Sequence, residues 1–179
     1  IRQYLDVKSI IRVVEIGAGT GEFLFSLRQM NFVGNYIAFE PQEQSHKCLE
    51  QLGSDIVKDI FDLRGAEKYK DSVDLVVMSH SLEHFNPGKI SEIVEAVRVM
   101  LREGGIFFCE VPNANLVIYP NAGERVVPHL SFFSIDSLKY LIKNVGMDLL
   151  FINACGNSQL GKSQTEIINE LDSKGHFIF

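Results

Sequence analysis

The sequence predicts an α/β protein in which helices cover both faces of a mainly parallel β-sheet. Strand-like and helix-like segments alternate between residues 11 and 111, an order that is typical of doubly wound sheets. The strand-like segments are nearly continuous in apolar residues, as expected where both faces of a sheet are buried. The first strand runs directly into a glycine turn and an amphipathic helix, which is a third indication of this fold.

The elements can be justified in chain order from their patterns. Apolar, β-branched runs predict five strands, at residues 11–16, 36–39, 55–57, 74–79 and 106–111. Apolar residues at helical spacing predict helices at residues 21–31, at 42–52 and from Asn86 to Gly104. Ser134 is expected to cap a helix that ends near Gly146. Two further apolar runs, at residues 149–154 and 176–179, and a short lead-in helix within residues 1–9 complete the expected elements.

The bulk composition limits the classes of function. The 179 residues are 46% hydrophobic and 22% charged, which is ordinary for a single globular domain spanning 1–179. A net charge of −6 without a basic run predicts no nucleic-acid partner, and no apolar stretch is long enough to predict a membrane span. Three scattered cysteines without a CxxC pair favour free thiols and a cytoplasmic location. The chain begins with Ile1, which leaves open a longer parent protein, and the oligomeric state is not predicted.

The glycine turn Glu15-Ile16-Gly17-Ala18-Gly19-Thr20-Gly21 predicts a ligand site. Glycines allow a ligand to approach the backbone closely, and the helix that follows offers unpaired N–H groups. A dinucleotide fingerprint, G-x-G-x-x-G, would require glycine where this chain has Glu22. A carboxylate there repels a diphosphate, and Glu15 adds a second negative group. The turn therefore fits a nucleoside with a cationic amino-acid tail better than a dinucleotide.

This turn resembles the first motif, E/D-x-G-x-G-x-G, of class I S-adenosylmethionine (SAM)-dependent methyltransferases. Further motifs follow in the expected order, so the resemblance covers nearly the whole chain. It implies a Rossmann-like, seven-stranded, mainly parallel sheet with an antiparallel edge strand, and it implies SAM as the cofactor. Glu15, Gly17, Gly19 and Gly21 are then predicted cofactor-binding residues.

Three later strand ends carry further candidate cofactor ligands. Glu40-Pro41 lies about 20 residues past the turn, where an acidic side chain hydrogen-bonds ribose hydroxyls in SAM and NAD sites alike; the alternative is a solvated loop carboxylate. The resemblance places Asp59 at the adenine amino group and Ile60 against the adenine ring. A helix or turn cap is the alternative for Asp59. The resemblance also places the backbone of Ser79-His80 along the methionine part of the cofactor.

The segment after the fourth strand also raises the question of a metal. Residues 80–84 contain two histidines and a carboxylate, which suggests metal ligands. Some RNA-end methyltransferases carry Glu-x-x-Glu-His and later histidines. Here His80 stands where the first glutamate of that pattern would be, so the pattern is broken. Glu83 and His84 are therefore expected to be structural, and we predict no metal.

The acceptor is indicated by one region. Glu110-Val111-Pro112-Asn113, followed by residues 128–134 (Pro-His-Leu-Ser-Phe-Phe-Ser), resembles methyltransferases of bacterial glycan, nucleotide-sugar and other small-molecule pathways. This resemblance implies a small-molecule acceptor, with a sugar or glycan precursor as the predicted substrate. Sugar C-methyltransferases often read His-Glu-His-Leu-Ser here, and only His129 of the two histidines is present, so C-methylation is not specifically predicted. Phe132 and Phe133 are expected in the core.

His129 is the predicted general base. Methyl transfer is an in-line displacement in which the leaving thioether needs no proton, but a hydroxyl acceptor must lose one. The ordinary pKa of histidine suits that task near neutrality. The alternative is that His129 only caps or packs its loop, and Tyr119 and Glu110 are weaker candidates for the base.

Three other functions stay open at this point. They are an NAD-linked oxidoreductase, a non-catalytic SAM-binding domain of a larger protein and an RNA methyltransferase. Glu22 and the apparent edge hairpin disfavour the first, and the acidic chain disfavours the third. The second is not excluded, because methyl transfer needs few chemical residues beyond the cofactor site.

Overall fold

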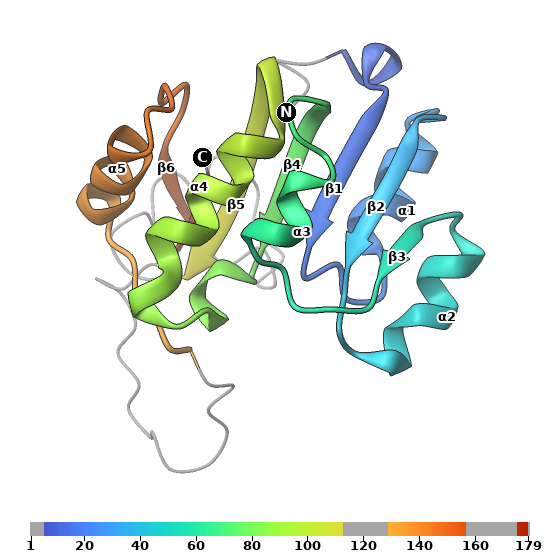
Figure 1. Cartoon of the computed structure of the whole chain (residues 1–179), viewed down its shortest axis with the longest axis horizontal. Helices are drawn as coiled ribbons and strands as arrows, with labels where there is room; N and C mark the ends of the chain where they lie inside the picture. Colours follow the sequence, from blue (N-terminus) through green and yellow to red (C-terminus); the bar gives the residue numbers. More distant parts are fainter. Residues whose placement is uncertain (1–5, 113–128, 157–174, 179) are drawn as a thin grey trace. The chain divides into compact units, whose positions relative to one another are not determined.

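A computed structural model describes residues 6–112, 129–156 and 175–178, and Figure 1 shows their elements in chain order. The main elements are β1 (Arg12–Ile16), α1 (Glu22–Gln29), β2 (Asn35–Phe39), α2 (Glu43–Gln51), β3 (Asp55–Val57), α3 (Leu63–Glu67), β4 (Val73–Ser79), α4 (Ile90–Met100), β5 (Leu101–Pro112), α5 (Ile135–Asn144), β6 (Asn153–Gly156) and β7 (Gly175–Ile178). Short 3₁₀ helices span Val7–Ser9, Leu82–His84 and Pro87–Lys89. The chain divides into two compact units: the first is Ile1–Ser79 with Glu92–Phe108, and the second is His80–Ser91 with Cys109–Phe179.

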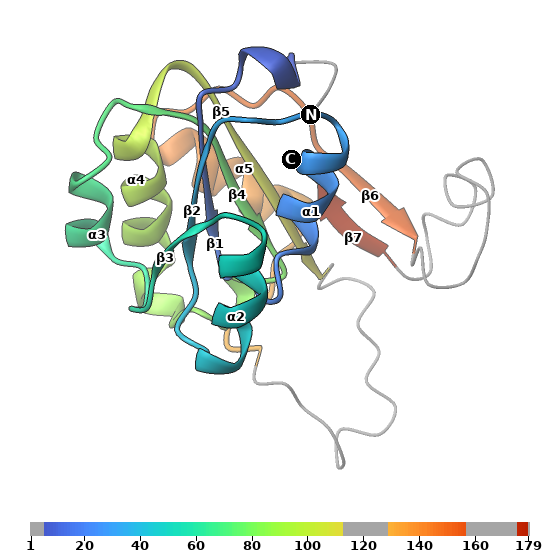
Figure 2. The same cartoon turned by 90° about the vertical axis from the view of Figure 1, so that its right-hand side faces the viewer.

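The first unit contains the parallel strands. β1 pairs in parallel with β2 and with β4, and β2 pairs in parallel with β3. The resulting order is β3-β2-β1-β4, with β5 as the next strand. Figure 2 shows α1 and α2 on one side of these strands and α3 and α4 on the other. The predicted α/β, Rossmann-like fold with a mainly parallel sheet is confirmed.

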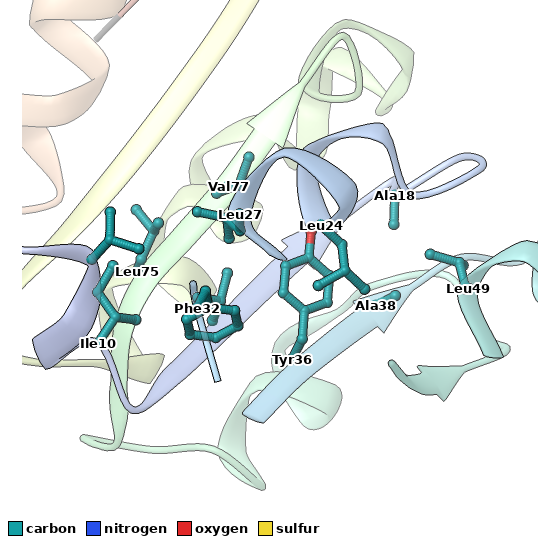
Figure 3. Close-up of a cluster of buried hydrophobic side chains, with 12 residues drawn as sticks. Ile10, Ala18, Leu24, Leu27, Phe32, Tyr36, Ala38, Leu49, Leu75 and Val77 are labelled. Carbon is teal, nitrogen blue, oxygen red and sulfur yellow. The ribbon is translucent and has the colours of Figure 1, made fainter. Parts of the chain in front are cut away.

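The burial of the central strands explains their sequence. Val13 and Val14 of β1 and Leu75 and Val76 of β4 are all fully buried. Neighbouring residues of a strand point to opposite faces, so complete burial requires that both faces are covered, as the continuous apolar runs predicted. Burying one such side chain contributes roughly 1.5–3 kcal/mol to folding. Figure 3 shows the cluster on the α1 side, where the labelled residues are Ile10, Ala18, Leu24, Leu27, Phe32, Tyr36, Ala38, Leu49, Leu75 and Val77.

A buried carboxylate anchors the entrance to β1. Asp74, at the start of β4, accepts hydrogen bonds on Oδ2 from the backbone N–H groups of Ile11 (2.9 Å) and Arg12 (2.7 Å). Its Oδ1 accepts from Nε of Arg102 at 2.6 Å. Burial alone would raise the pKa of Asp74, but the bonds from Arg12, Arg102 and Ile11 outweigh it and lower the pKa. Asp74 therefore holds the start of β1 beside β4 and β5.

The second unit contains antiparallel strands and a capped helix. Glu110 of β5 stands opposite Ile178 of β7, and β7 also pairs antiparallel with β6. α5 begins after Ser134, whose Oγ accepts from the backbone N–H of Ser137 at 3.2 Å. The Oγ of Ser137 in turn accepts from the backbone N–H of Ser134 at 2.9 Å, which completes a capping box. The predicted cap at Ser134 is confirmed.

Several element predictions need correction. α3 was not predicted, because its five residues are too short to show a helical period. The strand predicted at residues 149–154 begins only at Asn153, and the preceding apolar residues, Leu149, Leu150 and Phe151, are exposed. Phe132 was expected in the core and is 57% exposed, whereas Phe133 is buried as predicted. A short apolar run therefore did not distinguish a buried strand from an exposed connection.

Two smaller predictions can be checked in the same part of the chain. Cys48 and Cys109 are free thiols, as predicted. Among the described helices, none combines the length and the apolar character needed to cross a membrane.

Candidate functional site

The glycine turn after β1 has a backbone that favours glycine. Gly17, Gly19 and Gly21 have φ angles of 77°, 52° and 88°. These angles lie in the left-handed region, which costs other residues roughly 1–2 kcal/mol each. Gly21 is also the N-terminal cap residue of α1. The predicted sequence of strand, turn and helix is therefore confirmed, and its three glycines meet a conformational requirement.

Two of these glycines differ in their surroundings. A Cβ atom on Gly21 would lie 2.8 Å from a Leu52 methyl and 3.0 Å from a Leu49 methyl, so Gly21 lets the turn approach α2. A Cβ atom on Gly19 would have no heavy atom of the described residues within 4 Å. Gly19 therefore faces open space, in which a ligand can approach the backbone.

Glu40, directly after β2, is bonded to this turn. Its Oε2 accepts from the backbone N–H of Gly19 at 2.7 Å, and its Oε1 accepts from the backbone N–H of Gln42 at 2.8 Å. The carbonyl oxygen of Glu40 lies 2.7 Å from Nε2 of His46. Glu40 is only 4% exposed, so the alternative of a solvated loop carboxylate is wrong. Its contact with ribose hydroxyls stays a prediction.

Glu15, at the end of β1, is buried and bonded to the Tyr36 hydroxyl, which donates to Oε2 of Glu15. Burial is the main cause that raises the pKa of Glu15 to about 8, and the nearby Glu40 and Glu22 add to it, although the Tyr36 bond acts in the opposite direction. Burial and Glu15 likewise raise the pKa of Tyr36. Glu15 therefore keeps its proton at neutral pH, and the negative charge that the sequence interpretation gave it is largely absent.

Tyr36 is a residue of this site that the sequence analysis missed. The sequence carries no local signal for it, because the contact depends on the strand register, in which Ala38 stands opposite Glu15. Tyr36 lies two positions before Ala38 and so points to the same face of the sheet. A polar residue on that face requires a partner when it is buried.

The predicted adenine-binding residues lie after β3. Asp59 is exposed, Ile60 is 72% exposed, and Pro41 is also exposed. The helix cap that was the alternative for Asp59 belongs to Asp62, whose Oδ1 accepts from the backbone N–H of Gly65 at 2.8 Å. The roles of Asp59, Ile60 and Pro41 at the cofactor stay predictions.

His80 directly follows Ser79 and belongs to the second unit. Its φ angle of 53° is unusual for a residue other than glycine, and its N–H donates to the carbonyl oxygen of Glu110 at 2.9 Å. The ring lies between two carboxylates, with Nδ1 3.6 Å from Oε1 of Glu83 and Nε2 3.8 Å from Oε1 of Glu110. The direct side-chain interaction with Glu83 is the main cause that raises the pKa of His80; the charges of Glu110 and Glu83 add to it, and burial opposes it.

The second unit brings His129 close to the segment that contains Glu83 and His84. The carbonyl oxygen of Glu83 accepts from the backbone N–H groups of Leu130 (2.9 Å) and Ser131 (3.0 Å). Oγ of Ser131 donates to the carbonyl oxygen of Phe85 at 3.0 Å. The His84 and His129 rings then lie with centroids 5.1 Å apart. From the sequence, structural roles are predicted for Glu83 and His84 and a catalytic role for His129, whereas the structure brings the three residues together. Tyr119, Asn113 and Pro128 lie outside the described residues.

A family model and several solved structures that are similar to this chain all belong to methyltransferases. The family described as "Methyltransferase domain" matches residues 3–150. A SAM-dependent methyltransferase structure from Archaeoglobus fulgidus is similar at a TM-score of 0.71 and 19% identity, over 99% of this chain and 87% of that one. One from Mesorhizobium loti gives a TM-score of 0.70 and 17% identity, over 99% and 93%.

A third similar structure carries a named substrate. It is the Burkholderia thailandensis 1,6-didemethyltoxoflavin-N1-methyltransferase with bound 1,6-didemethyltoxoflavin and S-adenosylhomocysteine. Its TM-score is 0.64 at 13% identity, over 93% of this chain and 68% of that one. At these identities the solved structures establish the fold. No curated protein matches the sequence.

The buried carboxyl of Glu15 predicts a pH-dependent stability. Its pKa is about 8 in the folded chain against an ordinary value of 4.5, so between these values only the unfolded chain releases the proton. Rising pH therefore lowers the free energy of unfolding by up to about 1.4 kcal/mol per pH unit, and this loss of stability is complete above the pKa of the folded chain. Glu15→Gln lacks the titrating group, so its stability should not show this loss. In urea titrations, the free energy of unfolding of the wild type should therefore fall relative to that of Glu15→Gln between about pH 5 and about pH 8. A flat difference would show that Glu15 ionises normally.

Proposed function

This chain belongs to the methyltransferase domain family, and we propose that it transfers the methyl group of SAM to a small-molecule acceptor. The proposed cofactor site is supported mainly by two neighbouring features, the carboxylate of Glu40 and the open space beside Gly19. The carboxylate oxygens of Glu40 offer about four lone pairs, and the described backbone bonds use two of them. The remaining lone pairs can accept from the two hydroxyls of a ribose, and the left-handed turn admits the ligand beside Gly19.

The charges near the turn favour SAM over a dinucleotide. Glu22 is the first residue of α1 and stands where a dinucleotide site has its third glycine. A carboxylate at a helix N-terminus repels a diphosphate, but SAM carries no phosphate. The same charge contributes to the raised pKa of Glu15, so its field is felt inside the turn.

The proposed chemistry uses few protein groups. When bound, SAM supplies an electrophilic methyl carbon whose C–S bond breaks as the acceptor attacks. His129 is the proposed general base that takes the proton of an acceptor hydroxyl. The acceptor that we propose is a sugar or glycan precursor, and the support for it is the resemblance of Glu110–Asn113 and residues 128–134 to enzymes of such pathways. The similar Burkholderia thailandensis enzyme, which is shown with a small-molecule substrate, supports the broader class.

We also propose the complete sheet of the resembled fold, with seven strands and an antiparallel edge. β5 supports it, because its first residues belong to the first unit and its last residues pair with β7 in the second.

Calorimetric titration with S-adenosylhomocysteine tests the cofactor, with NADH as the parallel ligand. We expect micromolar binding of S-adenosylhomocysteine and none of NADH. Glu40→Ala should weaken that binding by about tenfold or more, because a hydrogen bond to a charged group contributes about 1.5–3 kcal/mol. Glu43→Ala removes an exposed carboxylate three residues later and should leave affinity unchanged. Tight NADH binding would overturn the proposal.

Gly19→Ala separates the ligand contact from backbone strain. Gly146 has a φ angle of 74°, and its Cβ position, like that of Gly19, has no neighbour within 4 Å. Gly19→Ala and Gly146→Ala should therefore each destabilise the fold by roughly 1–2 kcal/mol. Only Gly19→Ala should also weaken S-adenosylhomocysteine binding in calorimetry. Equal affinities of the two variants would contradict a ligand beside Gly19.

His129→Ala distinguishes an enzyme from a binding domain. The variant should lose about 10²–10⁴-fold in kcat, the usual contribution of a general base, while its affinity for S-adenosylhomocysteine is unchanged. Turnover is measured as release of S-adenosylhomocysteine in the presence of a panel of sugar nucleotides. If His129→Ala turns over at the wild-type rate, His129 is not the general base and only packs its loop.

A further inference from the structure

We propose that Glu83, His84 and His129 form a binding site for a divalent transition-metal ion of the Zn²⁺ type. The three side chains provide one carboxylate oxygen and two imidazole nitrogens, and these ligand atoms all lie within 4.8 Å of one another. The sequence analysis predicted no metal, because His80 breaks a known pattern of spacing. The structure instead brings in His129 from a distant segment, so the spacing around His80 does not decide the ligand set.

The strongest sign of a missing cation is Glu83. Its side chain is 1% exposed, and among the described residues no hydrogen bond reaches either carboxylate oxygen. Buried carboxylates are normally hydrogen-bonded, paired or bound to a metal, because desolvating the charge is costly. Nδ1 of His80 lies 3.6 Å from Oε1 of Glu83, within ion-pair range but beyond hydrogen-bonding distance. A metal ion between Glu83 and the two histidines would satisfy this requirement.

Backbone hydrogen bonds hold together the two segments that carry the three ligands. The carbonyl oxygen of Glu83 is bonded to the N–H groups of Leu130 and Ser131, which are the two residues that follow His129. Ser131, itself buried, bonds the carbonyl oxygen of Phe85. These bonds fix the two segments against each other at the position of the ligands. His84 and His129 are half-buried, so an ion has access from solvent.

The ligand set selects the kind of metal. Two histidines and one carboxylate are the ligands of many catalytic zinc sites and of non-haem iron, whereas Mg²⁺ and Ca²⁺ prefer oxygen alone. Ligand atoms about 2.1 Å from a tetrahedral Zn²⁺ lie about 3.4 Å apart. The separations, which reach at most 4.8 Å, must therefore contract by up to about 1.4 Å, which rotations of two half-buried imidazoles can provide.

A role in catalysis rests on the proposed function. A divalent ion in this position would bind an acceptor hydroxyl and lower its pKa, so that the proton leaves to solvent. In methyl transfer to such an acceptor, its oxygen would form the bond to the methyl carbon as the C–S bond breaks, and the electron pair would remain on sulfur. His129 acts as a ligand in the metal-loaded protein and as a general base in its absence.

The test uses metal-free protein without a histidine tag, titrated with Zn²⁺ by calorimetry and with Co²⁺ by visible absorption. We expect one equivalent of each ion to bind and a cobalt absorption band that shows nitrogen ligation. Glu83→Gln and His129→Gln should each weaken Zn²⁺ binding by about 100-fold or more, since even outer-shell changes cost 10–100-fold. His80→Gln is the matched control, because it removes the neighbouring histidine and should retain the affinity. Zn²⁺ should raise the Tm of the wild type and not that of Glu83→Gln.

The outcomes separate this proposal from the proposed function. The Tm of each metal-free variant reports its folding, and S-adenosylhomocysteine affinity of the wild type, Glu83→Gln and His129→Gln tests the cofactor independently. A wild type that binds S-adenosylhomocysteine but no Zn²⁺ would overturn the metal site alone. Equal Zn²⁺ affinity in the wild type, Glu83→Gln and His129→Gln would reveal an adventitious ion and overturn it too. Loss of affinity in His80→Gln matching that in His129→Gln would overturn the assigned ligands.

Discussion

The bond from the Gly19 N–H to the Glu40 carboxylate is the constraint on which the proposed cofactor site depends. The left-handed turn leaves backbone N–H groups without helical partners, and Glu40 accepts from one of them and from Gln42. This ties the ends of two adjacent parallel strands together. It also concentrates negative charge near Glu15, which responds by keeping its proton. Two close, buried carboxyl groups thus take different roles because their surroundings differ.

Glu83 organises the second unit in a different way, because its backbone and side chain have separate tasks. Its carbonyl oxygen accepts from the N–H groups of Leu130 and Ser131, whereas its buried carboxylate has no hydrogen bond within the described part of the chain. At Glu40 both polar groups are satisfied within the protein. Glu40 is thus held in place by backbone donors, whereas the carboxylate of Glu83 has a capacity for bonding that the proposed metal ion would use.

Local patterns predicted the parts of the structure that local chemistry determines. The turn from β1 into α1 and the Ser134 cap were predictable, because glycine conformation and side-chain capping act within a few residues. The bond between Tyr36 and Glu15 was not, since it depends on strand pairing. The gathering of Glu83, His84 and His129 was equally hidden, because residues 45 positions apart in sequence meet through backbone bonds. Ile60 and Phe132 show that apolar character alone does not fix burial.

The route of the chain through its two units constrains how the protein can be divided. The polypeptide leaves the first unit after Ser79, returns at Glu92 and leaves again after Phe108. Each unit is therefore assembled from two stretches, and no single cut in the polypeptide can release one of them whole. A fragment that ends at Phe108 would carry residues 80–91 without the rest of their unit. Separating the two units by genetic engineering would consequently require a rearranged gene, in which new joints connect stretches that are distant in the natural order.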